Sequence, residues 1–158
     1  LQLLRRAAPL DLELIEQPLP RELVDAQRAL PAALTATLMG DESLHDLADA
    51  ETLCTAPRPF GLFNVKLVKC GGIGPARAIA GLAAQHGIGL MWGCMDDSRI
   101  AIAAALHAAY SCPATRYLDL DGHLDLSRDF ADGGFTLVDG VMRLLGGPGL
   151  GIDPTNDW

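Results

Sequence analysis

The chain has 158 residues, of which 49% are hydrophobic and 20% are charged, a composition that favours a packed core over intrinsic disorder. The 12 basic residues are outnumbered by 20 acidic ones, and the net charge of −8 argues against nonspecific binding to nucleic acid or to an anionic membrane. No apolar run reaches the roughly 18 residues of a membrane-spanning helix. The length is too small for a complete eightfold α/β barrel, which needs about 250 residues. Because the chain begins with Leu1 and not with Met, we expect it to be part of a longer protein.

Short apolar runs alternate with helix-like stretches over most of the chain. We predict strands at residues 12–17, 34–40, 62–68, 88–92 and 117–120. Helices are predicted at residues 21–30, from Ser43 with Asp46 completing a capping box, from Gly74-Pro75 to Gly87, and from Ser98. Strands that alternate with helices in this way indicate an α/β fold with a parallel sheet covered by helices.

After Asp125 the pattern becomes that of a hairpin. Residues 136–138 and 141–144 are β-like and flank Asp139-Gly140, a strong signal for a two-residue turn. Residues 146–153 are rich in Gly and Pro, so we predict a loop that packs on another part of the protein.

Charged side chains lie in, end or follow the predicted strands, where a structural strand would carry Val, Ile or Leu. These residues are Glu16, Asp41, Lys66, Asp119 and Asp121. In α/β barrels the catalytic groups lie at the carboxyl ends of the strands, and side chains two residues apart share a face. We therefore expect the five groups to converge on one rim.

The chain has only two lysines, Lys66 and Lys69, and both lie in or beside one apolar strand. Loss of water lowers the pKa of a lysine ammonium, so a desolvated lysine can act as a base near neutral pH, whereas arginine cannot. Because of the carboxylates around it, we assign this role to Lys66. Lys69 has the opposite strand parity and is expected to reach solvent from the strand end.

Two of the acidic residues, Glu16 and Asp41, end adjacent predicted strands. Carboxylates in this arrangement can share a hard cation such as Mg²⁺. Two ligands are few for a fixed site, so a third should come from another strand. The alternative is that the two acids cap helices or form salt bridges.

The segment 71–74 (GGIG) precedes a predicted helix. Such a segment can cradle a phosphate or can form a tight turn between strand and helix. Lys69 is the one basic residue beside it, which favours the turn.

The four cysteines, Cys54, Cys70, Cys94 and Cys112, show no C-x-x-C spacing that would indicate a zinc or redox pair. We interpret them as reduced thiols of a cytoplasmic protein. Cys94 is the one for which a role beyond packing is considered.

Five motifs in order resemble the enolase superfamily, muconate-lactonizing subgroup. They are Ile15-Glu16-Gln17-Pro18, Asp41-Glu42-Ser43, NVKLVKCGGI from Asn64, GCMDDS from Gly93, and Asp119-Leu120-Asp121. The last motif is most similar to dipeptide epimerases of the L-Ala-D/L-Glu epimerase kind. The resemblance implies that residues 1–128 are a partial TIM-type barrel, strands four to eight. Residues 129–158 would be a C-terminal hairpin and tail that packs on a capping domain upstream of this chain.

The resemblance also implies a metal site and a base. Mg²⁺ would be held by Glu16 and Asp41 together with a third carboxylate from a strand before Leu1. Lys66 would be the acid/base lysine on one side of the substrate α-carbon, and the opposing lysine would also come from upstream.

The same resemblance implies a dipeptide substrate. Asp119 and Asp121 would hold the ammonium group of the dipeptide through charge-assisted hydrogen bonds. Gly93, Cys94 and Met95 would line the pocket.

Removing a proton next to a carboxylate needs a base and a cation that stabilises the enolate. The implied function is therefore that of a Mg-dependent dipeptide epimerase acting by 1,1-proton transfer. The chain alone is expected to be inactive and to associate with the missing N-terminal half or with itself, because five barrel strands leave two open edges. The alternatives are a muconate cycloisomerase or o-succinylbenzoate synthase-like enzyme, whose anionic substrates have no use for two acids at Asp119 and Asp121, and a non-catalytic half-barrel that acts as an interaction module.

Overall fold

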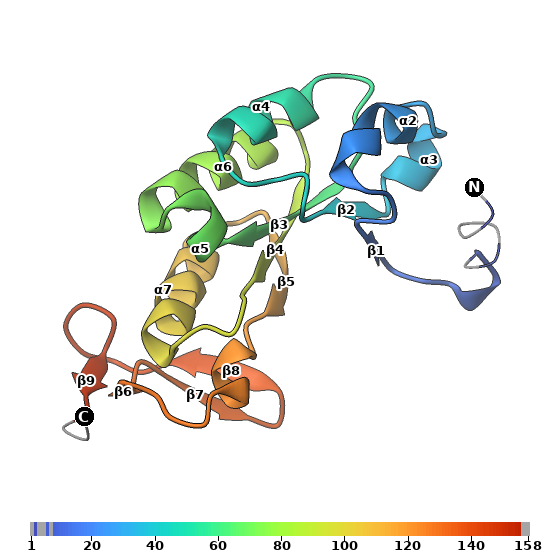
Figure 1. Ribbon diagram of the computed structural model, residues 1–158. Coiled ribbons are helices and arrows are strands. Elements are labelled where there is room, and N and C mark those ends of the chain that lie inside the picture. The colour runs from blue at the N-terminus through green and yellow to red at the C-terminus, as the bar shows by residue number, and fades with distance from the viewer. Residues whose placement is uncertain (1, 3–5, 7, 156–158) are drawn as a thin grey trace.

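Five parallel strands form one sheet, as predicted from the sequence. In this computed structural model, which describes residues 2, 6 and 8–155, the strand order is β1-β2-β3-β4-β5 (Figure 1). The strands are β1 Ile15–Glu16, β2 Leu38–Gly40, β3 Leu62–Lys66, β4 Gly89–Gly93 and β5 Thr115–Asp119. Spatial order follows chain order and every pairing is parallel, which is the arrangement of consecutive strands in a barrel wall. Among the described residues β1 and β5 are the two edges of this sheet.

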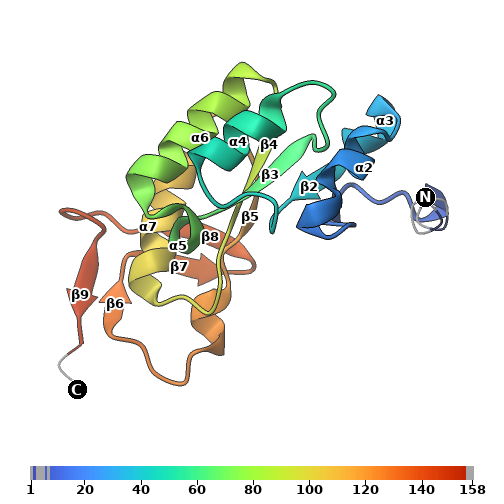
Figure 2. The same cartoon turned by 45° about the horizontal axis from the view of Figure 1, so that its top comes forward.

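The helices follow the strands and cover one face of the sheet. The α-helices are α2 Val24–Arg28, α3 Ala32–Thr35, α4 Leu47–Cys54, α5 Leu67–Cys70, α6 Ile73–Gln85 and α7 Arg99–Tyr110, and the 3₁₀ helices are η1 Ala8–Leu10, η2 Arg21–Leu23 and η3 Gly122–Asp125. Figures 1 and 2 show α4, α6 and α7 on the same side of the strands. In the described part of the chain none of these helices has the length and apolar character needed to cross a bilayer.

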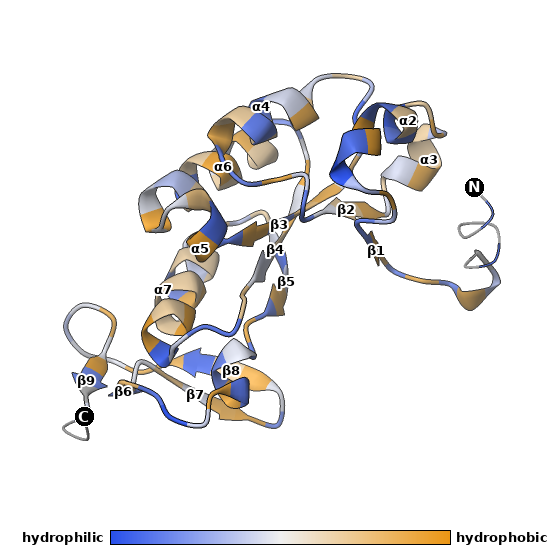
Figure 3. Cartoon of the chain, viewed as in Figure 1, coloured by the Kyte–Doolittle hydropathy of each residue, from blue (hydrophilic) through white to orange (hydrophobic). Residues whose placement is uncertain are grey.

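The core lies between the sheet and these helices. Phe63 and Val65 of β3 and Trp92 of β4 are at most 1% exposed and pack with Ile79 of α6 and Ile102 of α7. Burial of such large apolar side chains is the main stabilising contribution in a domain of this size. Figure 3 shows how apolar α7 is along most of its length, in agreement with its burial between the sheet and the C-terminal segment.

Several predicted boundaries differ from the structure. The predicted helix at 21–30 is divided into η2 and α2, and the predicted strand at 34–40 begins only at Leu38, because α3 follows Pro31. The predicted capping box at Ser43 is wrong. Asp46 itself is the N-cap of α4, and its side chain accepts a 2.9 Å hydrogen bond from the backbone N–H of Asp49.

The predicted strand at 62–68 ends at Lys66, and residues 67–70 form the helical turn α5. Gly71 and Gly72 then connect α5 to α6 with φ angles of 89° and 108°. Side chains with a Cβ rarely adopt such angles, so the glycines allow the tight turn favoured by the sequence. Gly87, with φ of 66°, follows the end of α6 as predicted.

The C-terminal segment packs on α7. The predicted hairpin is confirmed as β7 Phe135–Val138 and β8 Val141–Leu144, with positive φ at Asp139 and Gly140. The prediction of a loop at 146–153 is wrong at its end, because β9 Ile152–Pro154 pairs antiparallel with β6 Ala131–Gly133. The packing of this segment on an upstream capping domain stays a prediction, and its last residues, 156–158, lie outside the described residues.

The side chain of Arg99, at the start of α7, connects this helix to the C-terminal segment. Its Nε donates a 2.6 Å hydrogen bond to the carbonyl of Gly133, and its guanidinium lies 4.2 Å from the ring centroid of Phe135. Its backbone N–H donates to the carboxylate of Asp129. Ser98 is the N-cap of α7 as predicted, but its side chain makes no capping hydrogen bond, and Asp129 takes that role.

Candidate functional site

An open pocket of about 630 Å³ lies at the carboxyl ends of the strands. It is lined by four of the predicted site residues, Glu16, Asp41, Lys66 and Asp119, together with Glu42 and the segment 17–20. Each of the four ends or directly follows a different strand, β1, β2, β3 or β5. The sheet therefore brings a lysine and three carboxylates to one rim, where α/β barrels place their chemistry.

Asp41 is the centre of the charged cluster. Its carboxylate accepts a 2.8 Å hydrogen bond from Nζ of Lys66 on one oxygen and a hydrogen bond from Nζ of Lys69 on the other. Lys69 also donates a 2.6 Å hydrogen bond to the backbone carbonyl of Asp41. The three side chains are only 11–15% exposed, so these ion pairs are shielded from solvent.

The expectation that Lys69 reaches solvent is therefore wrong. Strand parity fails after Lys66 because residues 67–70 turn into α5. The helical turn directs Lys69 back toward the end of β2, whereas Val68 is 60% exposed.

The protonation of the cluster also differs from the expectation of a depressed lysine pKa. Burial lowers the pKa of Lys66, but the hydrogen bond to Asp41 and the charges of Asp41, Glu16 and Glu42 outweigh it, so the pKa of Lys66 is raised. Burial would raise the pKa of Asp41, yet the two lysines together lower it. In this arrangement Lys66 is an ammonium held by Asp41 rather than a free base.

Glu16 lies beside this cluster, and its carboxylate is bonded to the side chain of Asn64. Nδ2 of Asn64 donates a 2.8 Å hydrogen bond to Oε1 of Glu16. Burial raises the pKa of Glu16, and the neighbouring carboxylate of Asp41 adds to this effect. The hydrogen bond from Asn64 lowers the pKa but does not outweigh them, so the pKa of Glu16 is raised. Two close carboxylates that repel one another form a set of hard oxygen donors that fits a divalent cation such as Mg²⁺.

Within the described residues no three His, Cys, Asp or Glu side chains are grouped so that they could hold a metal ion. Glu16 and Asp41 are two candidate ligands, and the described residues do not group a third such side chain with them. The oxygen-rich donor set agrees with Mg²⁺, and the part of the chain that the structure describes offers an incomplete set of ligands.

Gln17 connects the end of β1 to the loop after β2, a role that its sequence motif alone does not indicate. Its Oε1 accepts hydrogen bonds from the backbone N–H groups of Asp41 and Ser43, at 3.0 and 3.2 Å, and its Nε2 donates to Oγ of Ser43 at 2.9 Å. Gln17 has a φ of 35°, which only few non-glycine residues adopt. This side chain fixes the loop that carries Asp41.

Cys94 contacts the turn of Asp119 and Asp121. Its Sγ lies 3.2 Å from the carbonyl of Asp119, 3.3 Å from the backbone N–H of Gly122 and 3.9 Å from Oδ1 of Asp121. A thiol with an acceptor and a donor on either side connects the end of β4 to the segment after β5. Burial raises the pKa of Cys94, so this thiol is protonated near neutral pH.

Four predicted substrate-binding residues, Gly93, Cys94, Met95 and Asp121, do not line the pocket itself. Asp121 lines a neighbouring hollow with Asp119 and apolar side chains of the hairpin. Sδ of Met95 lies 4.0 Å from Nζ of Lys66, at the rim of the pocket. Gly93 pairs with Lys66 across the β3–β4 ladder.

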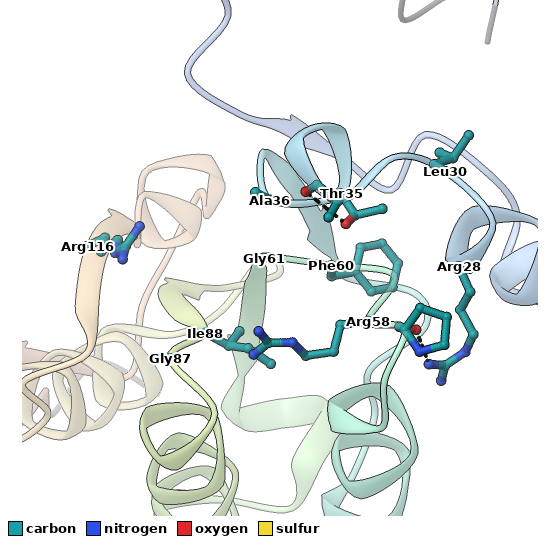
Figure 4. Close-up of a pocket in the computed structure, with 12 residues that line it drawn as sticks. Arg28, Leu30, Thr35, Ala36, Arg58, Phe60, Gly61, Gly87, Ile88 and Arg116 are labelled. Atoms are coloured by element: carbon teal, nitrogen blue, oxygen red, sulfur yellow. Dashed lines mark hydrogen bonds between the residues drawn. The ribbon is translucent and has the colours of Figure 1, made fainter.

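A second pocket, of about 460 Å³, lies at the opposite end of the strands, near Gly61 and Gly87 (Figure 4). Three arginines line it, Arg28, Arg58 and Arg116. The guanidinium of Arg28 donates to the carbonyls of Thr52, Thr55 and Pro57, and Arg58 donates to the carbonyl of His86. These two arginines serve to hold backbone segments together, and we do not assign a site to this end.

The comparisons with known proteins agree with the predicted resemblance. Residues 1–158 match the family model described as enolase C-terminal domain-like. The chain is 57% identical over 152 residues to the L-Lys-D/L-Arg epimerase of Methylococcus capsulatus, covering 96% of this chain and 43% of that protein. It is 34% identical to the L-Ala-D/L-Glu epimerase of Clostridium acetobutylicum, covering 94% of this chain and 41% of the relative.

A solved structure gives the same result. The dipeptide epimerase of Methylococcus capsulatus, in complex with Mg and the dipeptide L-Arg-D-Lys, superposes with a TM-score of 0.92 at 57% identity, covering 96% of this chain and 43% of that one. This chain spans less than half the length of these relatives, and its five parallel strands form part of a barrel. The chain belongs to the enolase C-terminal domain-like family.

Proposed function

We propose that this chain is the C-terminal part of a Mg-dependent dipeptide epimerase, which inverts the carbon α to a carboxylate through an enolate. The observation that carries the proposal is the placement of Lys66 next to the carboxylates of Glu16 and Asp41 at one end of the sheet. The relatives of known name support it, since they are epimerases of L-Lys-D/L-Arg and L-Ala-D/L-Glu dipeptides.

In this proposal the residues have separate tasks. Glu16 and Asp41 hold Mg²⁺ together with an upstream carboxylate, and the ion supplies charge stabilisation for the substrate carboxylate as it becomes an enolate. Nζ of Lys66 removes or returns a proton at the α-carbon from one side. An upstream lysine acts on the other side, so the configuration is inverted.

The substrate is a dipeptide whose ammonium group binds near Asp119 and Asp121. Both acids are exposed at the end of β5, and Asp119 lines the pocket with Lys66. We infer a preference for basic dipeptides of the L-Lys-D/L-Arg type, because the relative that is 57% identical carries that name. Gly93 and Met95 contribute by shaping the rim, and Cys94 holds the turn of Asp119 and Asp121.

The test is a fused protein in which this chain replaces the matched region of the Methylococcus capsulatus epimerase and keeps that protein's upstream part. Incubation in D₂O with L-Arg-L-Lys and Mg²⁺ should give α-deuterium incorporation and the epimer, both followed by NMR. Chelation of Mg²⁺ should abolish both signals. A fused protein that is folded and binds Mg²⁺ but exchanges no α-proton would contradict the proposal.

The 158-residue chain by itself should show no exchange, because one lysine and one metal ligand are not in it. Its partners are expected to be the missing N-terminal half or a second copy. Among the described residues β5 is an edge of the sheet, which leaves its backbone groups open to such pairing. A cytoplasmic location is supported by the four free thiols.

A further inference from the structure

Asn64 is a buried polar residue in the middle of β3, on the same face as Lys66. Its side chain is almost fully enclosed, at 1% exposure for the residue. Nδ2 donates a 2.8 Å hydrogen bond to Oε1 of Glu16, whereas Oδ1 is buried and has no hydrogen-bond partner in the described part of the chain. An unpaired buried amide oxygen destabilises a fold, so this residue is poorly explained as a purely structural one.

The amide orientation follows from its neighbours. If the amide were turned by 180°, Oδ1 would face the carboxylate oxygen of Glu16, and two acceptors would repel one another. Nδ2 therefore has to point to Glu16, which leaves Oδ1 on the side of β4.

Gly93 provides the space that this orientation needs. A Cβ at Gly93 would lie 2.2 Å from Oδ1 of Asn64 and 3.0 Å from both Cγ and Nδ2. Any larger residue at this position would displace the amide from Glu16. Gly93 does not have a positive φ, so its requirement for glycine comes from the contact and not from the backbone.

We propose that Asn64 is a positioning residue for Glu16, and that the absence of a Cβ at Gly93 leaves the space that the Asn64 amide occupies. By donating to one carboxylate oxygen, Asn64 directs the other toward the cation site that Glu16 shares with Asp41. The inference rests on the proposed function, in which Glu16 is a metal ligand. It reassigns Gly93 from contact with the substrate to support of the metal ligand.

The test compares Asn64→Leu with the parent in the fused protein. Mg²⁺ affinity measured by calorimetry should fall about 10- to 100-fold, the usual effect of removing a partner of a metal ligand. The melting temperature of the metal-free protein should stay the same or rise, because an apolar side chain of similar size replaces a half-paired amide. The KM for the dipeptide at saturating Mg²⁺ should stay within about threefold, because Asn64 does not touch the substrate.

Gln27→Leu is the matched control. Gln27 is also 1% exposed, has one bonded and one unpartnered amide atom, and bonds to the carbonyl of Pro59 away from the pocket. Its replacement should leave Mg²⁺ affinity unchanged.

Gly93→Ala gives a second test that does not remove Asn64. Alone it should weaken Mg²⁺ binding about tenfold, the lower end of that range. Asn64→Ala removes the side chain from the space beside Gly93. Added to that variant, Gly93→Ala should cause no further loss of Mg²⁺ affinity, because the two changes act on one contact.

The outcomes separate the two proposals. A parent fused protein that binds no Mg²⁺ contradicts the proposed function. A parent that binds and epimerises while Asn64→Leu and Gly93→Ala bind Mg²⁺ equally well overturns only the role of Asn64. If Asn64→Leu does not fold, Gly93→Ala and the double variant decide, and additive effects of the two changes overturn the inference.

Discussion

Nζ of Lys66 lies 2.8 Å from Oδ2 of Asp41, so the proposed proton carrier and a proposed metal ligand are paired directly. A lysine in this pair is a donor and carries no free lone pair for a substrate proton. Lys69 bonds to the other oxygen and to the backbone carbonyl of Asp41. We therefore expect Lys66 to leave Asp41 when a cation binds, while Lys69 keeps the carboxylate in place.

Replacement of Lys66 by Met should remove proton transfer on one face of the substrate. In the fused protein we expect kcat to fall by about 10²–10⁴, the usual contribution of a positioned acid or base. The measurement is α-proton exchange in D₂O, followed separately for the two epimers of the dipeptide. Arg77→Met, which removes a positive charge from the exposed surface of α6, should exchange like the parent. An unchanged exchange rate in Lys66→Met would exclude this lysine as the carrier.

Lys69 should be coupled energetically to Asp41. A double-mutant cycle of Lys69→Met and Asp41→Asn, measured by chemical unfolding of the metal-free fused protein, should give an interaction of about 0.5–3 kcal/mol. The reason is that both side chains are largely shielded from solvent and that loss of either leaves a charge without one partner. A coupling near zero would mean that the pair behaves like an exposed surface ion pair.

The sequence allowed the sheet and most of its rim to be predicted, because both have local signals. Strands of a buried parallel sheet are short apolar runs, and a Glu, Asp or Lys at the end of such a run is unusual enough to be noticed. Glu16, Asp41, Lys66 and Asp119 were found in this way, and the structure places all four in one pocket.

What the sequence could not predict depends on contacts between distant segments. Parity placed Asn64 on the correct face of β3, but it cannot tell that the side chain reaches Glu16, 48 residues away. Lys69 was misplaced because a change from strand to helical turn at Leu67 has no clear local signal. The pairing of β6 with β9 was missed because two strands of three residues have little pattern of their own.

Asp119→Asn should weaken binding of the dipeptide without affecting Mg²⁺. A hydrogen bond to a charged group contributes about 1.5–3 kcal/mol, so we expect kcat/KM to fall about 10- to 100-fold. Most of the change should be in KM, since the ammonium group is distant from the α-carbon that reacts. Equal Mg²⁺ affinity in the two proteins, measured by calorimetry, is the control. A lower Mg²⁺ affinity with unchanged KM would place Asp119 at the metal instead of at the substrate.

His123 in η3 should make stability sensitive to mild acid. Its ring packs edge-on against Phe135 with centroids 5.0 Å apart, and its Nδ1 is buried without a hydrogen-bond partner among the described residues. Burial lowers the pKa of His123, and the charge of Arg99 lowers it further. The unfolded chain then takes up a proton before the folded chain does. The stabilising effect of the neutral ring is complete above the ordinary pKa of about 6.5 and is lost as the pH falls below it toward the folded pKa.

The measurement is the melting temperature of the fused protein at pH 7.5 and at pH 5.5, above the range in which most carboxylates titrate. The parent should melt lower at pH 5.5, and His123→Phe should show a smaller difference between the two pH values. The phenyl ring keeps the contact with Phe135 and cannot take up a proton, so its contribution to stability is the same at both pH values. The difference between the pH values is therefore the informative quantity. An equal acid-dependent loss in the parent and in His123→Phe would assign the effect to other groups.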